Sequence, residues 1–126
     1  MSHIFKKLAL ALLFMALLLP ATQALANKSV VAIVAPDAAA KGTEITIKLN
    51  VTHSGNNMFH HTNWVYLVVN GKEAARWEFS AFDLPKDENF TLEFKLIVEE
   101  AMQLEALANC NLHGSTGKVF QTINLK

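Results

Sequence analysis

The sequence predicts an all-β domain, an immunoglobulin-like antiparallel β-sandwich of about seven strands, preceded by a cleavable signal peptide. Three observations support this fold class. Several segments alternate apolar and polar residues with a period of two, as strands with one buried face do. Turn signals such as Asn70-Gly71, which favours a hairpin, separate these segments. No segment after residue 26 has a convincing helical pattern, and short strands without helices are typical of a sandwich.

The first 26 residues have the three parts of an export signal. Lys6 and Lys7 give a positive start, Leu8 to Leu19 is an unbroken apolar run, and Ala24-Leu25-Ala26 is a small-residue cleavage pattern. The run is shorter than the roughly 20 residues that a membrane-spanning helix needs, and Pro20 closes it. We therefore expect a signal peptide at 1–26, one domain at 27–126, a periplasmic or secreted product, and no membrane association after cleavage.

The expected strands follow the alternating or β-branched segments. The segment before Pro36 is expected at a sheet edge, and Ala38 to Lys41 is expected to turn the chain. In chain order, the strands are Ser29 to Val34, Glu44 to Val51, Trp64 to Val69, Lys72 to Phe79, Phe90 to Val98, Gln103 to Cys110 and Lys118 to Leu125.

Charge and cysteine content exclude several functions. Without Lys6 and Lys7 the 11 basic residues fall to nine against 11 acidic ones, so no basic surface for nucleic acid is indicated. The single cysteine, Cys110, cannot form an intramolecular disulfide, although the expected compartment is oxidising. No Cys-x-x-Cys-His motif for covalent haem is present. Cys110 is therefore expected to be either buried and inert or a metal ligand.

Two short segments contain every histidine and cysteine after the signal peptide. These residues are His53, His60, His61, Cys110 and His113. In an immunoglobulin-like order, the loops after the second and sixth strands lie at the same end of the sandwich. Imidazoles and one thiolate suit iron, copper or zinc rather than calcium or magnesium. We therefore predict a mononuclear metal site where the two loops meet.

The strand pattern also orients the candidate ligands. His53 and Cys110 continue the inward faces of their strands. The neighbours His60 and His61 would point to opposite sides of an extended chain, so only one of them is expected to bind unless the loop bends. His113 follows Cys110 at a spacing of three, in a turn that contains Gly114, which lets both side chains reach one ion.

Two motifs in these segments resemble the superoxide reductase family, the desulfoferrodoxin and neelaredoxin group. The stretch from His53 to His60, followed by Trp64, is similar to the family's two-histidine loop, and Cys110-Asn111-Leu112-His113-Gly114 is similar to its other ligand motif. The resemblance implies an immunoglobulin-like sandwich that holds mononuclear non-haem iron. It further implies that superoxide is reduced to hydrogen peroxide with electrons from a separate donor protein.

Carried over by position, the resemblance implies Cys110 as the axial ligand and His53, His60 and His113 as equatorial ligands. Superoxide would bind opposite the thiolate. The family usually takes a fourth histidine from an earlier Glu-Lys-His loop, whose lysine assists the substrate. No histidine occurs between Asn27 and Thr52, so His61 is the remaining candidate for the fourth position, and no lysine can be carried over.

Two other functions remain open from the sequence. A cupredoxin-like copper protein for electron transfer would use two histidines, Cys110 and an axial methionine such as Met58, although no methionine follows His113. A structural sandwich could instead bind a partner through exposed aromatic residues such as Trp77 or Phe82. We expect both of these in the core, because large aromatic side chains mostly bury their area.

Overall fold

The computed structural model describes residue 3 and residues 27–126, so the predicted signal peptide lies almost wholly outside the described residues. The strands are β1 (Val30–Val34), β2 (Ala38–Ala39), β3 (Glu44–Thr52), β4 (Thr62–Val69), β5 (Lys72–Glu78), β6 (Phe90–Ile97), β7 (Met102–Cys110) and β8 (Val119–Leu125). Within residue 3 and residues 27–126, no helix has the length and apolar character needed to span a bilayer.

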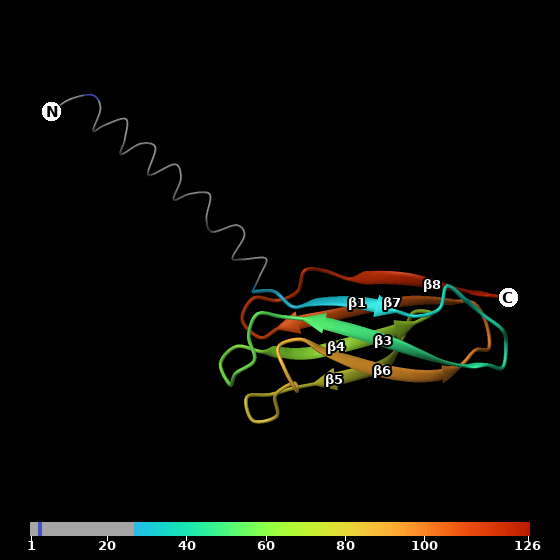
Figure 1. Cartoon of the computed structure of the whole chain (residues 1–126), viewed down its shortest axis with the longest axis horizontal. Helices are drawn as coiled ribbons and strands as arrows, with labels where there is room; N and C mark the ends of the chain where they lie inside the picture. Colours follow the sequence, from blue (N-terminus) through green and yellow to red (C-terminus); the bar gives the residue numbers. More distant parts are fainter. Residues whose placement is uncertain (1–2, 4–26) are drawn as a thin grey trace.

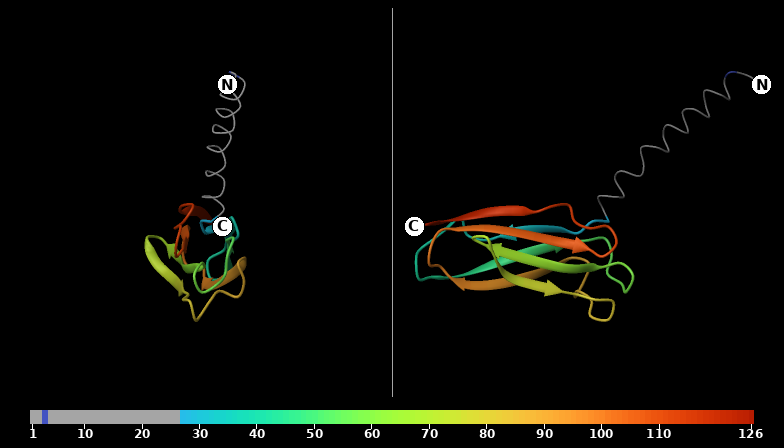
Figure 2. Two further views of the ribbon diagram at one scale, coloured as in Figure 1. Left: turned by 90° about the vertical axis from the view of Figure 1, so that its left-hand side faces the viewer. Right: turned by 180° about the vertical axis from the view of Figure 1, so that it is seen from behind.

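The strands form two sheets that face each other (Figures 1 and 2). One sheet has the order β1-β3-β6, and the other has the order β2-β8-β7-β4-β5. Every pairing is antiparallel except that of β2 with β8. The predicted antiparallel sandwich is therefore confirmed, and β1 lies at a sheet edge as expected.

Alternating side chains from both sheets fill the space between them. Ile47 and Leu49 of β3 are fully buried, as are Leu67 of β4 and Leu104 of β7. The polar residues between them point outward, which is the period of two expected from the sequence. The hydrophobic effect of this apolar layer holds the two sheets together.

The hairpin between β4 and β5 forms as its sequence predicts. Asn70 has φ 50° and Gly71 has φ 79°. Both residues therefore have the positive φ values that a two-residue hairpin turn requires.

Two sequence expectations differ from the structure. Ala38–Ala39 forms the short strand β2 rather than a simple turn, because its backbone pairs in parallel with Asn124 and Leu125 of β8. Trp77 packs against the core as expected, but Phe82 is 93% exposed. Phe82 lies in the connection between β5 and β6, outside both sheets, so no apolar layer covers it.

The loops that contain the candidate ligands lie at one end of the sandwich. Figure 1 shows the β3–β4 and β7–β8 connections together at the left-hand end, and the described chain also begins there. The C-terminus lies at the opposite end. The predicted convergence of the two loops is therefore confirmed.

Truncating Leu67 tests how much of the fold's stability comes from the core. Leu67→Ala should lower the free energy of unfolding by about 2–5 kcal/mol, because a fully buried leucine leaves a cavity. The matched control is Phe82→Ala, which should change it by no more than about 0.5 kcal/mol. Urea titration of both variants measures the difference, and equal losses would contradict this description of the core.

Candidate metal centre

Two strands deliver His53 and Cys110 to the end of the sandwich. His53 follows β3 directly and is 4% exposed, and Cys110 is the last residue of β7 and is 1% exposed. Both side chains point inward, as the alternation in their strands predicts. The antiparallel pairing of β4 with β7 sets Thr62 opposite Cys110, so the loop that precedes β4 ends beside the cysteine.

A tight turn brings His113 back towards Cys110. The Cys110 amide donates to the Gly114 carbonyl at 2.8 Å, and the Gly114 amide donates to the Cys110 carbonyl at 3.0 Å. Gly114 has φ 78°, a backbone angle that residues with a Cβ rarely adopt. This backbone places His113 Nδ1 3.8 Å from Cys110 Sγ. The Cys-x-x-His spacing therefore brings the two donor atoms together.

The first loop folds back on itself around Asn57. The Asn57 amide donates to the His60 carbonyl at 3.0 Å, and the His60 amide donates to the Asn57 carbonyl at 3.2 Å. Gly55 is needed where the His60 ring packs, because a Cβ at position 55 would lie 2.8 Å from His60 Nδ1. This bend directs the His60 imidazole into the site.

Asn111 joins the two loops. Its side-chain Oδ1 accepts from the His61 amide at 2.9 Å, and its Nδ2 donates to the Phe59 carbonyl at 3.0 Å. Its own amide donates to the His61 carbonyl at 3.1 Å. Three hydrogen bonds from one residue therefore hold the first loop against the Cys110–Gly114 turn.

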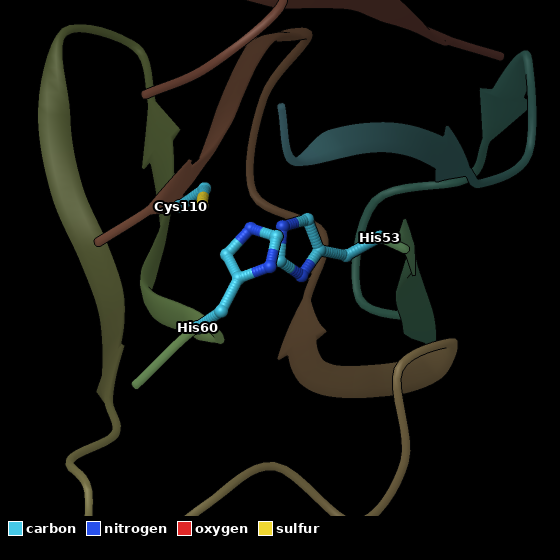
Figure 3. Close-up of side chains that lie close together, drawn as sticks. All are labelled: His53, His60 and Cys110. Atoms are coloured by element: carbon cyan, nitrogen blue, oxygen red, sulfur yellow. The ribbon is translucent and has the colours of Figure 1, made fainter. Parts of the chain in front are cut away.

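These loops bring four of the five predicted ligands together. One donor atom from each of His53, His60 and Cys110, which Figure 3 shows, lies within 4.8 Å of the other two. His113 Nδ1 lies 3.2 Å from His60 Nε2. For ions bound at about 2.1 Å, adjacent donors are about 3.0 Å apart and opposite ones about 4.2 Å apart. The spacing of this cluster therefore suits one ion at its centre.

Two backbone carbonyl oxygens fix the His53 ring. The Gly55 oxygen lies 2.7 Å from Nδ1, and the Asn27 oxygen lies 3.1 Å from Nε2. A neutral imidazole has one N–H, so it donates to one of these oxygens and keeps a lone pair on its other nitrogen. Fixing a ring by its second nitrogen in this way is the usual support for a metal-binding histidine.

The surroundings of the His60 imidazole favour its neutral form. Burial, followed by the neighbouring His53 ring, lowers the pKa of His60 below its usual value, and a hydrogen bond with the Asn27 backbone opposes part of this effect. The neighbouring imidazoles of His113 and His61 lower the pKa further. A neutral ring has a lone pair available, and metal binding requires that form.

His61 lies outside the group of three that share this space. Its side chain is buried, and its Nδ1 lies 3.0 Å from the Asn57 carbonyl oxygen. Adjacent residues thus have different surroundings: His60 faces the other candidate ligands, and His61 packs beneath the loop. Met58, the candidate axial ligand of a copper site, is 44% exposed.

A cavity of about 340 Å³ opens beside His53. Lys28 and Glu88 both line it, so its wall has one charge of each sign.

The donor set fits iron. Imidazole nitrogens and a thiolate suit iron, copper and zinc, and within residue 3 and residues 27–126 the clustered donors include no carboxylate. Sequence reasoning predicted the clustered side chains but missed the residues that hold them, namely Gly55, Asn57, Asn111 and Asn27. A glycine and three asparagines in loops also occur in ordinary turns, so they gave no separate signal.

Known structures share the fold of this chain. A superoxide reductase (neelaredoxin) from Ignicoccus hospitalis is 20% identical, with 79% of this chain and 82% of that one covered and a TM-score of 0.65. The CARDB domain of a Pyrococcus furiosus protein, in complex with di-metal ions, is 14% identical over 79% of this chain and 94% of its own, with a TM-score of 0.58. The sulfur carrier protein SoxY from Chlorobium limicola is 10% identical over 76% and 78%, with a TM-score of 0.56.

These low identities establish the fold alone, and three differently described proteins share it. No curated protein sequence matches the chain significantly. The family model for desulfoferrodoxin, in contrast, matches residues 21–116, which include both ligand-bearing loops. Because the match spans most of the sequence, the chain belongs to the desulfoferrodoxin family.

Proposed function

We propose that this chain is an exported protein that binds one non-haem iron ion and reduces superoxide to hydrogen peroxide. One observation carries the proposal: His53, His60 and Cys110 converge within 4.8 Å in a chain of the desulfoferrodoxin family. His113 adds a fourth donor, 3.2 Å from His60. The export signal predicted at 1–26 would bring the product to the periplasm or the outside of the cell.

Each ligand has a defined task in this proposal. His53, His60 and His113 supply neutral nitrogens, and Cys110 supplies a thiolate. The Gly55 carbonyl holds the His53 ring, and Asn111 holds the two loops against each other by hydrogen bonds. Preorganised ligands of this kind lower the cost of collecting four side chains around one ion.

The reaction consumes one electron and two protons for each superoxide that becomes hydrogen peroxide. Bound iron would supply the one-electron chemistry, with the Cys110 thiolate tuning its electron density. A separate electron donor protein returns the electron. Within the described residues the His/Cys cluster is the one group of candidate metal ligands, so a second redox centre has no support there.

The surroundings give little electrostatic guidance for an anionic substrate. The chain lacks the Glu-Lys-His loop, and the cavity beside His53 has both Lys28 and Glu88 on its wall. A balanced pair of charges attracts an anion less than a wall of one sign does. Iron binding and superoxide reduction are therefore tested separately.

Metal content and the visible spectrum test iron binding. The processed protein should contain one equivalent of iron and show, when oxidised, a thiolate-to-iron absorption band. Cys110→Ser should abolish that band, whereas Ser80→Ala, on the exposed connection after β5, should leave it unchanged. An intense blue copper band would support the cupredoxin-like alternative instead, and no stoichiometric metal would refute both.

The yield of peroxide tests the reaction. With a reduced electron donor present, a reductase forms one hydrogen peroxide for each superoxide consumed, whereas dismutation forms one for every two. We expect the first ratio from the iron-loaded protein, measured after a calibrated pulse of superoxide. A ratio of one to two, or a rate equal to that of the Cys110→Ser control, would contradict superoxide reduction while leaving iron binding intact.

The two adjacent histidines should differ when each is replaced. His60→Ala should weaken iron binding by at least about tenfold, because it removes a donor next to His113 and Cys110. His61→Ala should leave the iron content and spectrum unchanged, because its ring lies against the Asn57 carbonyl. Competition with a chelator measures both affinities. If only His61→Ala lost iron, His61 rather than His60 would be the ligand.

A further inference from the structure

The backbone of Asn27 lies against one of the proposed iron ligands. Its carbonyl oxygen is 3.1 Å from His53 Nε2. The Asn27 side chain contacts the same loop, since its Oδ1 accepts from Ser54 Oγ. Asn27 is the residue that directly follows the predicted cleavage pattern Ala24-Leu25-Ala26. The expected start of the processed chain is therefore at the metal centre.

Hydrogen bonds fix the segment that begins at Asn27. Asn27 Oδ1 accepts from Ser54 Oγ at 3.2 Å, which joins it to the first loop. Two residues on, Ser29 is fully buried and its amide donates to the Gly114 carbonyl at 3.2 Å. Ser29 Oγ also lies 2.8 Å from Thr62 Oγ1. The start of the domain is thus held between the two ligand-bearing loops.

We propose that the α-amine of Asn27, formed when a signal peptidase removes residues 1–26, is a nitrogen ligand of the same iron ion. The inference rests on the proposed function. Water supplies the hydroxyl that stays on the Ala26 carboxyl group and the hydrogen that the Asn27 nitrogen gains. The amine fills the fourth nitrogen position, for which the side chains offer only His61.

Cleavage changes the chemistry of the Asn27 nitrogen. In the uncleaved chain its lone pair is delocalised into the peptide bond and is a poor ligand. A free α-amino group has a pKa of roughly 7.7–8.0, so a metal ion can displace its proton near neutral pH. The site would then be complete only after export.

His61 is the less suitable source of that nitrogen. Its ring Nδ1 lies against the Asn57 carbonyl, and its side chain is outside the group of clustered donors. Asn27 already contacts His53, because its carbonyl oxygen lies 3.1 Å from His53 Nε2.

Amine reactivity in the exported, processed protein tests the proposal. The full chain is expressed with its export segment, and intact mass establishes whether the product begins at Asn27. The metal-free and iron-loaded forms are then treated near neutral pH with an acylating reagent, which prefers the α-amine because lysine amines have a pKa of roughly 10.4. Modification at Asn27 should be at least about tenfold slower with iron, and modification of the exposed Lys41 should be equal in both forms.

A second variant measures the effect on the metal. One glycine inserted between Ala26 and Asn27 moves the amine by a residue but keeps every side-chain ligand. Iron affinity should fall by at least about tenfold and the thiolate band should shift. A start other than Asn27, equal amine reactivity in both forms, or an unchanged affinity after the insertion would each overturn the inference while the proposed iron site stands. Failure of the processed protein to bind iron would overturn both.

Discussion

The antiparallel pairing of β4 with β7 is the constraint on which the candidate metal centre depends. It sets Thr62 opposite Cys110, and therefore brings the end of one ligand-bearing loop to the start of the other. A change of register by one residue would turn Cys110 away from the core and separate it from His60. The three hydrogen bonds of Asn111 act on loops that this pairing has already brought together.

Local sequence pattern predicted most of the fold and most of the side chains that converge at the candidate site. The period of two located β3 and β7 and correctly turned His53 and Cys110 inward. Strand β2 was missed because two alanines show no alternation of apolar and polar residues. They are a strand only through their pairing with β8. Phe82 was misjudged because the rule that aromatic residues are buried says nothing about a loop that leaves both sheets.

The supporting residues of the site could not be predicted for a related reason. Asn111 bonds to residues about fifty positions earlier, and Asn27 contacts His53, which lies 26 positions later. Such partners are set by the folded backbone, whereas the type of the ligand side chains is visible at once. Which of His60 and His61 points into the site likewise depends on the bend of the loop around Asn57. The alternation of residues along an extended strand does not predict this bend.

The hydrophobic core is independent of the ligands. Apolar side chains from both sheets form it, and Cys110 and the histidines lie at its end rather than within it. This arrangement differs from small zinc domains, in which the ion supplies the folding free energy. It also agrees with the presence of the same fold in a CARDB domain and in SoxY, since a scaffold that folds by its core can carry different sites on its loops.

The burial of Cys110 has a consequence for the chemical survival of this protein. In the oxidising compartment that the proposed export would give it, the single thiol would have no partner within its own chain and would be open to mixed disulfides with other molecules. Cys110 is 1% exposed and begins the turn that ends at Gly114, so its burial would slow attack by an external disulfide. The packing that turns this candidate ligand inward would therefore also slow cross-linking between copies of the chain.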